Sequence, residues 1–219
     1  MKNRIFSWVR TLFAAVLSVS LVISALSAFP AARAEDAIAN AATESYRYSV
    51  EIEFGAMTFC YDYGTWNPSN LRYESEETEA PAAGTVAGFP GWYGFDGISN
   101  KISVKYNDSS ATVTDDPAHA FLSVSLTYRA LTATDGGTSI VPNVGGITPE
   151  LYRDRDLTQP IGEIQDTVLT VAKNGSASVW LSLRGEPTVG TTPFRSENLV
   201  PIGMLTITLG TFRATEGGN

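Results

Sequence analysis

Apolar and polar side chains alternate with a period of two along most of this chain, most clearly in residues 46–54, 102–106, 122–128, 177–183 and 205–209. Such alternation is typical of β-strands that bury one face. No long segment has the 3.6-residue period of an amphipathic helix, and residues that favour turns separate the alternating segments. Many short strands between frequent turns predict an all-β domain, an antiparallel β-sandwich of the jelly-roll or Ig-like type.

Gly55 marks a change of phase in this pattern. The apolar positions before it are even-numbered, as at Ile52 and Phe54, whereas those after it are odd-numbered, as at Met57 and Phe59. A glycine at such a change is typical of a bulge or a tight turn.

Asn174-Gly175 is the strongest short hairpin signal in the chain. We therefore expect Ile164–Lys173 and Ser176–Leu183 to pair as antiparallel neighbours. The last alternating segment is expected to close a sheet. If Leu205–Phe212 lies at an edge of that sheet, its open backbone groups can recruit a strand from another copy of the chain.

Residues 1–34 have the three zones of a secretory signal peptide. A positive zone (Lys2, Arg4 and Arg10) precedes an apolar run from Thr11 to Phe29, and Ala32-Arg33-Ala34 has the small-x-small pattern of a cleavage site. The alternative is a permanent membrane anchor, since about 18 apolar residues can span a bilayer. Pro30 and the small residues at the cut favour a cleaved signal helix. We expect the mature protein to be secreted or associated with the cell surface, without a membrane contact after cleavage.

Cleavage after Ala34 would leave 185 of the 219 residues, a normal size for one domain. We expect a flexible segment at 35–45, a single β-sandwich domain at 46–213 and a polar tail at 214–219. The mature chain would hold 11 basic and 23 acidic residues, a net charge near −12. Because that charge repels nucleic acids and anionic membranes, neither is an expected partner.

The inventory of reactive residues argues against several classes of enzyme. His119 and Cys60 are the only histidine and cysteine, too few for the ligand sets of zinc or copper sites. A surface position is the favoured interpretation for His119, and a small buried hydrophobe for Cys60. There is no glycine-rich phosphate loop or dinucleotide-binding motif. We expect a protein that is not an enzyme.

Carboxylates keep two other chemistries open. A glycoside hydrolase needs only two facing acids, and the candidates are Glu51, Glu53, Asp62, Asp96, Asp154 and Asp156. Asp154 and Asp156 are also candidate ligands for a structural calcium ion. No other cofactor is expected.

Aromatic residues cluster in two turn-rich stretches. Residues 89–95 hold four rings, among them Trp92 and Tyr93, and Trp66 lies in the turn-rich stretch 64–68. Exposed rings at one end of a sandwich could form a sugar-binding platform from Trp66, Trp92 and Tyr93. The alternative, which we favour, is that these rings fold inward and close the end of the core. Trp180 alternates with Val179 and Leu181 and is expected on the outer side of its sheet.

Several short motifs resemble a group of uncharacterised small secreted proteins of Gram-positive gut bacteria. The motifs are YSVEIEFG at 48–55, residues 59–63, GTWNP at 64–68, LRY at 71–73, NKISVKYN at 100–107 and IGMLTITLG at 202–210. The resemblance implies a β-sandwich at the cell surface. A looser similarity connects the chain with the camelysin and biofilm-fibre family and with WxL wall-binding domains, although residues 180–183 depart from the WxL spacing.

These observations lead to three hypotheses about function. The first is a secreted, non-enzymatic surface, matrix or adhesion domain that acts by binding an extracellular protein or glycan or by self-assembly. The second is a carbohydrate-binding module that uses the loop aromatics. The third is a hydrolase with an acid pair.

Overall fold

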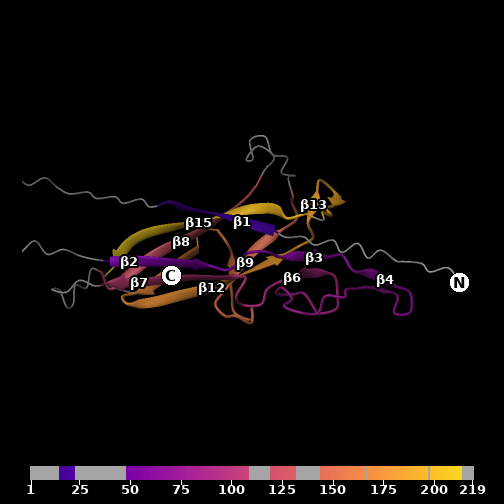
Figure 1. Ribbon diagram of the computed structural model, residues 1–219, viewed down its shortest axis with the longest axis horizontal. Coiled ribbons are helices and arrows are strands. Elements are labelled where there is room, and N and C mark those ends of the chain that lie inside the picture. The colour runs from indigo at the N-terminus through magenta and orange to yellow at the C-terminus, as the bar shows by residue number, and fades with distance from the viewer. Residues whose placement is uncertain are drawn as a thin grey trace, which may run out of the picture.

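The computed structural model describes residues 15–22, 48–108, 119–131, 144–165, 167–196 and 198–213, and every statement below concerns these residues. The expected segment 35–45, the cleavage site and the tail at 214–219 lie outside them. The described chain is all-β, with two main sheets and three two-stranded ribbons. Figure 1 shows the strands of the main sheets running along the long axis of the molecule. No helix in the described ranges is long and apolar enough to cross a membrane.

The larger sheet has five strands in the order β10-β9-β12-β7-β2. Its strands are β2 (Tyr48–Phe54), β7 (Lys101–Asp108), β9 (Thr148–Tyr152), β10 (Pro160–Glu163) and β12 (Gly175–Arg184). All four neighbouring pairs are antiparallel.

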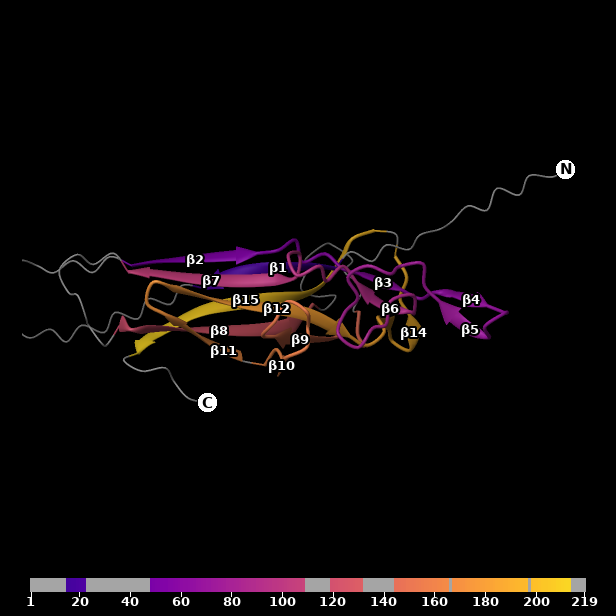
Figure 2. The same ribbon diagram turned by 90° about the horizontal axis from the view of Figure 1, so that it is seen from below.

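The smaller sheet has four strands in the order β1-β15-β8-β11. They are β1 (Ala15–Val22), β8 (Phe121–Ala130), β11 (Thr167–Ala172) and β15 (Val200–Arg213). The pairs of β8 with β11 and β15 are antiparallel, whereas β1 runs parallel to β15. Figure 1 shows the two sheets as two layers, and Figure 2 turns them so that the strands of each sheet lie side by side.

Both sheets contribute their alternate apolar residues to one core. Ile102 and Val104 of β7 are completely buried, as are Leu126 of β8 and Leu205 and Ile207 of β15. The alternation predicted for these segments is therefore confirmed, because the intervening residues are more exposed. Burial of this shared apolar face is the main force that holds the two layers together.

The phase change at Gly55 is confirmed as well. Met57 and Phe59 are buried although Phe54 marks the even-numbered face of β2. A Cβ atom on Gly55 would lie 2.2 Å from the carbonyl oxygen of Ile98, so the chain passes too close to a neighbouring backbone for any side chain.

The predicted pairing across Asn174-Gly175 is wrong. The turn exists, with Asn174 at a φ of 55°, but β11 before it pairs with β8 and β12 after it pairs with β7 and β9. The turn therefore carries the chain from one layer to the other. Each strand buries its apolar face, at Val171 and Val179, in the shared core, and the two strands satisfy their backbone groups with different neighbours.

The N-terminal segment also differs from the expectation. The only described part of the expected signal helix, Ala15–Val22, is the strand β1. β1 pairs with β15 from Ala15 opposite Val200 to Val22 opposite Thr208. With these residues in place, β15 is therefore an interior strand of this sheet and not the edge strand that the sequence left open.

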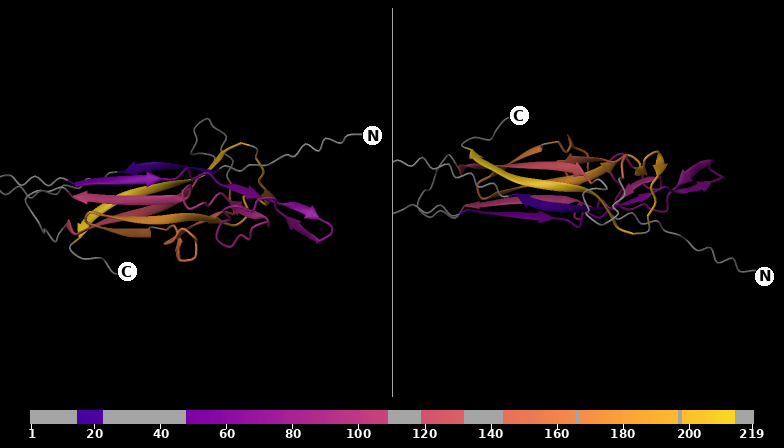
Figure 3. Two further views of the ribbon diagram at one scale, coloured as in Figure 1. Left: turned by 60° about the horizontal axis from the view of Figure 1, so that its bottom comes forward. Right: turned by 90° about the horizontal axis from the view of Figure 1, so that it is seen from above.

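Three ribbons gather at one end of the two sheets. They pair β3 (Cys60–Asp62) with β6 (Gly91–Tyr93), β4 (Thr65–Asn67) with β5 (Arg72–Glu74), and β13 (Thr188–Val189) with β14 (Thr192–Pro193). The β4–β5 hairpin projects beyond the other two ribbons, as both views in Figure 3 show.

Candidate functional site

Trp92 and Tyr93 do not form the exposed platform that the sequence left open. Both side chains are 1% exposed. The indole Nε1 of Trp92 donates a hydrogen bond to the carbonyl of Gly185 (2.7 Å), and the hydroxyl of Tyr93 donates to the carbonyl of Phe89 (2.5 Å). The alternative interpretation, in which these rings close the end of the core, agrees with these contacts.

The physical reason is that β6 has partners on both sides. Tyr93 lies opposite Cys60 of β3 and forms a bridge with Pro81 of the preceding loop. Phe59 and Phe95 stack beside this strand with ring centroids 4.4 Å apart. Glycine and proline in 89–95 shape the turns, but the large apolar surface of the rings is better buried than exposed.

Trp66, by contrast, is on the surface, with 48% of its side chain exposed. It lies opposite Tyr73 in the β4–β5 hairpin, and Tyr73 is 56% exposed. The two ring centroids are 5.3 Å apart at an angle of 63°, an edge-to-face contact. Leu71, at the end of the turn, is 74% exposed. Trp66 and Tyr73 therefore give one face of the projecting hairpin an apolar surface that is open to solvent, and Leu71 adds an exposed apolar side chain at its turn.

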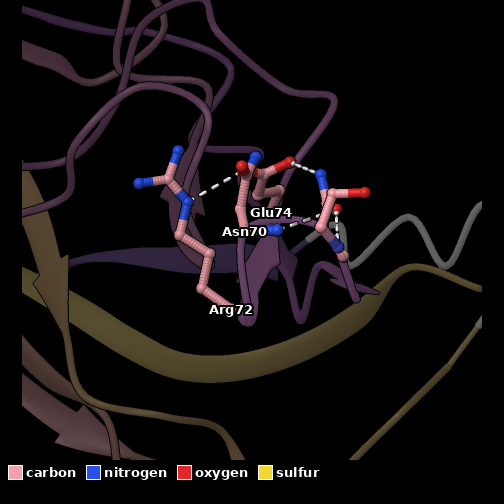
Figure 4. Close-up of polar contacts among 5 residues, drawn as sticks. Asn70, Arg72 and Glu74 are labelled. Carbon is pink, nitrogen blue, oxygen red and sulfur yellow. Dashed lines mark hydrogen bonds and ion pairs between the residues drawn. The ribbon is translucent and has the colours of Figure 1, made fainter.

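A polar network covers the other strand positions of the hairpin, shown in Figure 4. Glu74 is its centre and accepts hydrogen bonds from Asn67 Nδ2 (2.5 Å), Asn70 Nδ2 (2.7 Å) and Arg72 Nε (2.8 Å). Asn67 Oδ1 also accepts bonds from the backbone N–H groups of Ser69 and Asn70, which stabilises the turn.

The same contacts set the charge of the hairpin. Hydrogen bonds from Asn67, Arg72 and Asn70 lower the pKa of the Glu74 carboxyl to about 2, so it is ionised at any physiological pH. The guanidinium of Arg72 also lies 4.8 Å from the ring centroid of Phe89, a cation–π contact that connects the hairpin with the loop before β6.

The base of the hairpin is fixed by close packing. Gly64 has a φ of 67°, and a Cβ atom there would lie 2.8 Å from the carbonyl oxygen of Glu74. Asp62 accepts hydrogen bonds from the backbone N–H of Gly64 (2.8 Å) and from the Ser75 hydroxyl. These contacts join the first and last residues of the hairpin and hold it in one orientation.

The two candidate calcium ligands, Asp154 and Asp156, differ in their surroundings. Both carboxylate oxygens of Asp154 accept hydrogen bonds from the loop that follows, from Thr158 N and Oγ1 and from Gln159 N. Although desolvation works against it, these bonds lower the pKa of Asp154. Asp156 is exposed, and in the described ranges no three His, Cys, Asp or Glu side chains come together as a metal site. Calcium binding stays a prediction.

Two of the other candidate acids, Glu51 and Asp96, also have local partners. Glu51 faces Lys105 across two strands at 3.4 Å, and Asp96 accepts bonds from the backbone of Ile98 and Ser99. For Asp96, desolvation raises the pKa and these hydrogen bonds outweigh it, so the pKa is lowered. A general acid needs the opposite shift.

The surroundings of Cys60 and His119 do not indicate a catalytic role for either residue. Cys60 is half-buried, and desolvation, with help from Glu77 and Asp62, raises the pKa of its thiol to about 11. A nucleophilic cysteine needs a lowered pKa. The ring of His119 packs on Phe212, with centroids 4.7 Å apart.

Sequence reasoning found Trp66 but not its neighbours. Tyr73 and Leu71 lie in a stretch with too few residues to show a clear alternation, and nothing local indicates that Glu74 is bonded by three side chains. The turn residues Asn67-Pro68-Ser69-Asn70 were the available signal for a hairpin.

Comparison with protein-family models, curated proteins and solved structures found no match for this chain.

Proposed function

We propose that this protein is a secreted, non-enzymatic surface or adhesion domain that binds an extracellular protein through the apolar face of its β4–β5 hairpin. The observation that carries the proposal is the joint exposure of Trp66, Leu71 and Tyr73 on a hairpin that projects from the body of the molecule. We further infer that the body is a β-sandwich of the jelly-roll or Ig-like type, because its two sheets share one core.

The chemistry of the hairpin is that of a protein-binding surface. Trp, Tyr and Arg are the residues most enriched at the energetic centres of protein interfaces. Trp66 and Tyr73 form one of the three residue pairs of this hairpin, and Arg72 belongs to the next pair, opposite Asn67. The Glu74 network and the packed base hold these side chains in place before binding. Less conformational entropy is then lost when a partner docks.

The orientation of the rings favours a protein over a glycan at this site. Two aromatic rings that stack on successive sugars of one chain need to be nearly coplanar. Trp66 and Tyr73 are inclined by 63°, so a flat sugar chain cannot contact both faces. The carbohydrate-binding module that used Trp92 and Tyr93 loses its platform because both are buried.

The test is a binding panel measured by bio-layer interferometry. The mature chain, residues 35–219, is presented to purified extracellular-matrix, mucosal and bacterial envelope proteins. We expect binding to at least one of them, and Trp66→Ala should weaken it about 30-fold, because an interface centre contributes about 2 kcal/mol or more. Leu199→Ala is the matched control, since Leu199 is 59% exposed and lies outside the hairpin. A blank panel, or binding that Trp66→Ala leaves unchanged, contradicts the proposal.

A second candidate function, self-assembly, is favoured by the position of β1. Ala15–Val22 belongs to the segment that we expect to be removed on secretion, and it covers one side of β15. Its removal would open the backbone groups of β15 between Val200 and Thr208, and open strands recruit others.

Sedimentation of residues 35–219 over increasing concentration tests this second candidate. We expect oligomers, and we expect a synthetic peptide of the sequence AVLSVSLV to reduce them whereas a scrambled peptide does not. A monomer at every concentration argues against assembly through β15. The acid-pair hydrolase remains the third hypothesis.

A further inference from the structure

The outer face of the five-stranded sheet carries a hollow that is separate from the hairpin. Its volume is about 420 Å³, within the range of about 300–1,000 Å³ of small-molecule sites. The hollow is lined by strand residues Glu53, Phe54, Lys101, Ser103 and Trp180, by Gly55, and by Gly97, Ile98 and Arg155 from two loops. Lys101 and Ser103 alternate with the buried Ile102 and Val104, so they face away from the core.

Trp180 is held in a fixed orientation in this hollow. Its indole Nε1 donates a hydrogen bond to the carbonyl of Gly97 (3.0 Å), and the ring is half-buried. The ammonium of Lys101, on the neighbouring strand, lies 5.9 Å from the ring centroid. The ring is therefore an apolar surface with a fixed orientation, and it lies beside a positive charge.

Arg155 lines the hollow, and its side chain is also held in a fixed orientation. Its Nε and Nη2 atoms donate to the carbonyl of Asp96 at 3.3 and 3.0 Å. Its stem crosses Gly97, where a Cβ atom would lie only 2.2 Å from Arg155 Cγ and where φ is 78°. The completely buried side chain of Asn100 accepts a hydrogen bond from the backbone N–H of Gly97 and so holds the loop that contains Gly97 in place.

The hollow carries two positive charges, those of Lys101 and Arg155. In the described part of the chain, four basic residues pair with carboxylates: Arg72, Lys105, Lys173 and Arg184. Neither Lys101 nor Arg155 forms an ion pair with a described residue, although the whole protein has a net charge of −8. Arg155 does interact electrostatically with the Asp96 carboxyl, and Glu53 is the one carboxylate among the residues that line the hollow. The two cations outnumber that carboxylate, and the excess of positive charge favours an anionic ligand.

We propose that this hollow binds an acidic saccharide. The apolar face of a pyranose ring would pack on Trp180, and its carboxylate would pair with Lys101 and Arg155. Glu53 and the hydroxyl of Ser103 supply hydrogen-bond partners for sugar hydroxyls. An aromatic surface, a pair of cations and polar groups for hydroxyls together match a uronic or sialic acid better than a simple anion or a neutral sugar.

Isothermal titration calorimetry on residues 35–219 tests this site with five probes. Three are acidic saccharides: a galacturonate tetramer, a hyaluronan tetramer and sialyllactose. Maltotetraose is the neutral sugar, and citrate is an anion without a sugar ring. We expect binding of at least one acidic saccharide and at least tenfold weaker binding of maltotetraose and citrate. Binding of none of the three acidic saccharides, or equal binding of citrate, overturns the proposal.

Variants locate the binding. Arg155→Gln changes an exposed side chain and should weaken the bound saccharide at least tenfold, as should Lys101→Gln. Trp180→Ala should abolish binding, and if that variant does not fold, the two cation variants still decide the question. Trp66→Ala should leave saccharide binding unchanged, which separates this site from the hairpin. Wild-type affinity in both cation variants contradicts the proposal.

Discussion

Asn100 offers the sharpest test of how the loop before β7 is held. Its side chain is completely buried, and its Nδ2 donates to the carbonyl of Leu181 (2.8 Å) while its Oδ1 accepts from the backbone N–H of Gly97 (2.9 Å). Asn100→Ala removes both bonds in one substitution. Two buried backbone groups then lose their partners without access to water.

The expected loss follows from those two groups. A buried polar group left without its hydrogen bond costs about 1–3 kcal/mol, so the free energy of unfolding should fall by about 2–6 kcal/mol. For a domain of this size, each kcal/mol lowers Tm by about 2–4 °C, and we expect a decrease of roughly 4–24 °C.

Urea denaturation followed by circular dichroism measures the change. Ser178→Ala is the control, because it removes a single hydrogen bond, 3.1 Å long and half-buried, between Ser178 and Ser103. The control should lose about 1 kcal/mol or less. If the free energy of unfolding of Asn100→Ala lies within about 1 kcal/mol of the wild-type value, about the net value of one ordinary hydrogen bond, the reasoning is refuted.

Three further predictions concern ionisation. The Cys60 thiol, with its pKa raised to about 11, should react with iodoacetamide far more slowly at pH 8 in the folded protein than in urea; equal rates would contradict its burial. Burial raises the pKa of Tyr128 to about 12, above the ordinary value of 10. The contribution of Tyr128 to stability is therefore complete below pH 10 and is lost as the pH rises toward 12. Measuring Tm and tyrosinate absorbance over this pH range checks the prediction, and ionisation of Tyr128 at pH 10 would refute it. Glu74, with its pKa lowered to about 2, should stabilise the hairpin fully above pH 4.5 and lose that effect as the pH falls through 2; NMR titration of its carboxyl measures the midpoint, and a value near 4.5 would show that the network does not form in solution.

The sequence predicted what depends on neighbours along one strand. Alternation in β7, β8 and β15 identified the core positions, because side chains in a strand point to opposite faces in turn. The phase change at Gly55 was visible for the same reason. These features are local, so one sequence is enough to show them.

Other features depend on contacts between distant segments, and the sequence did not show them. Asn174-Gly175 indicates a tight turn, but only the remaining strands decide that β11 and β12 join different sheets. The burial of Trp92 depends on the carbonyl of Gly185, 93 residues later. The hollow at Trp180 needs loops from both sides of β12, and its charge can be judged only when the partners of Lys101 and Arg155 are known.

Hydrogen–deuterium exchange with a bound protein partner shows whether the β4–β5 hairpin is the contact surface. When the mature chain binds a protein from the panel, we expect slower exchange of the backbone amides in residues 64–75, with no change in 101–106 of β7. Protection confined to other parts of the surface, with the hairpin exchanging as in the free protein, would contradict it.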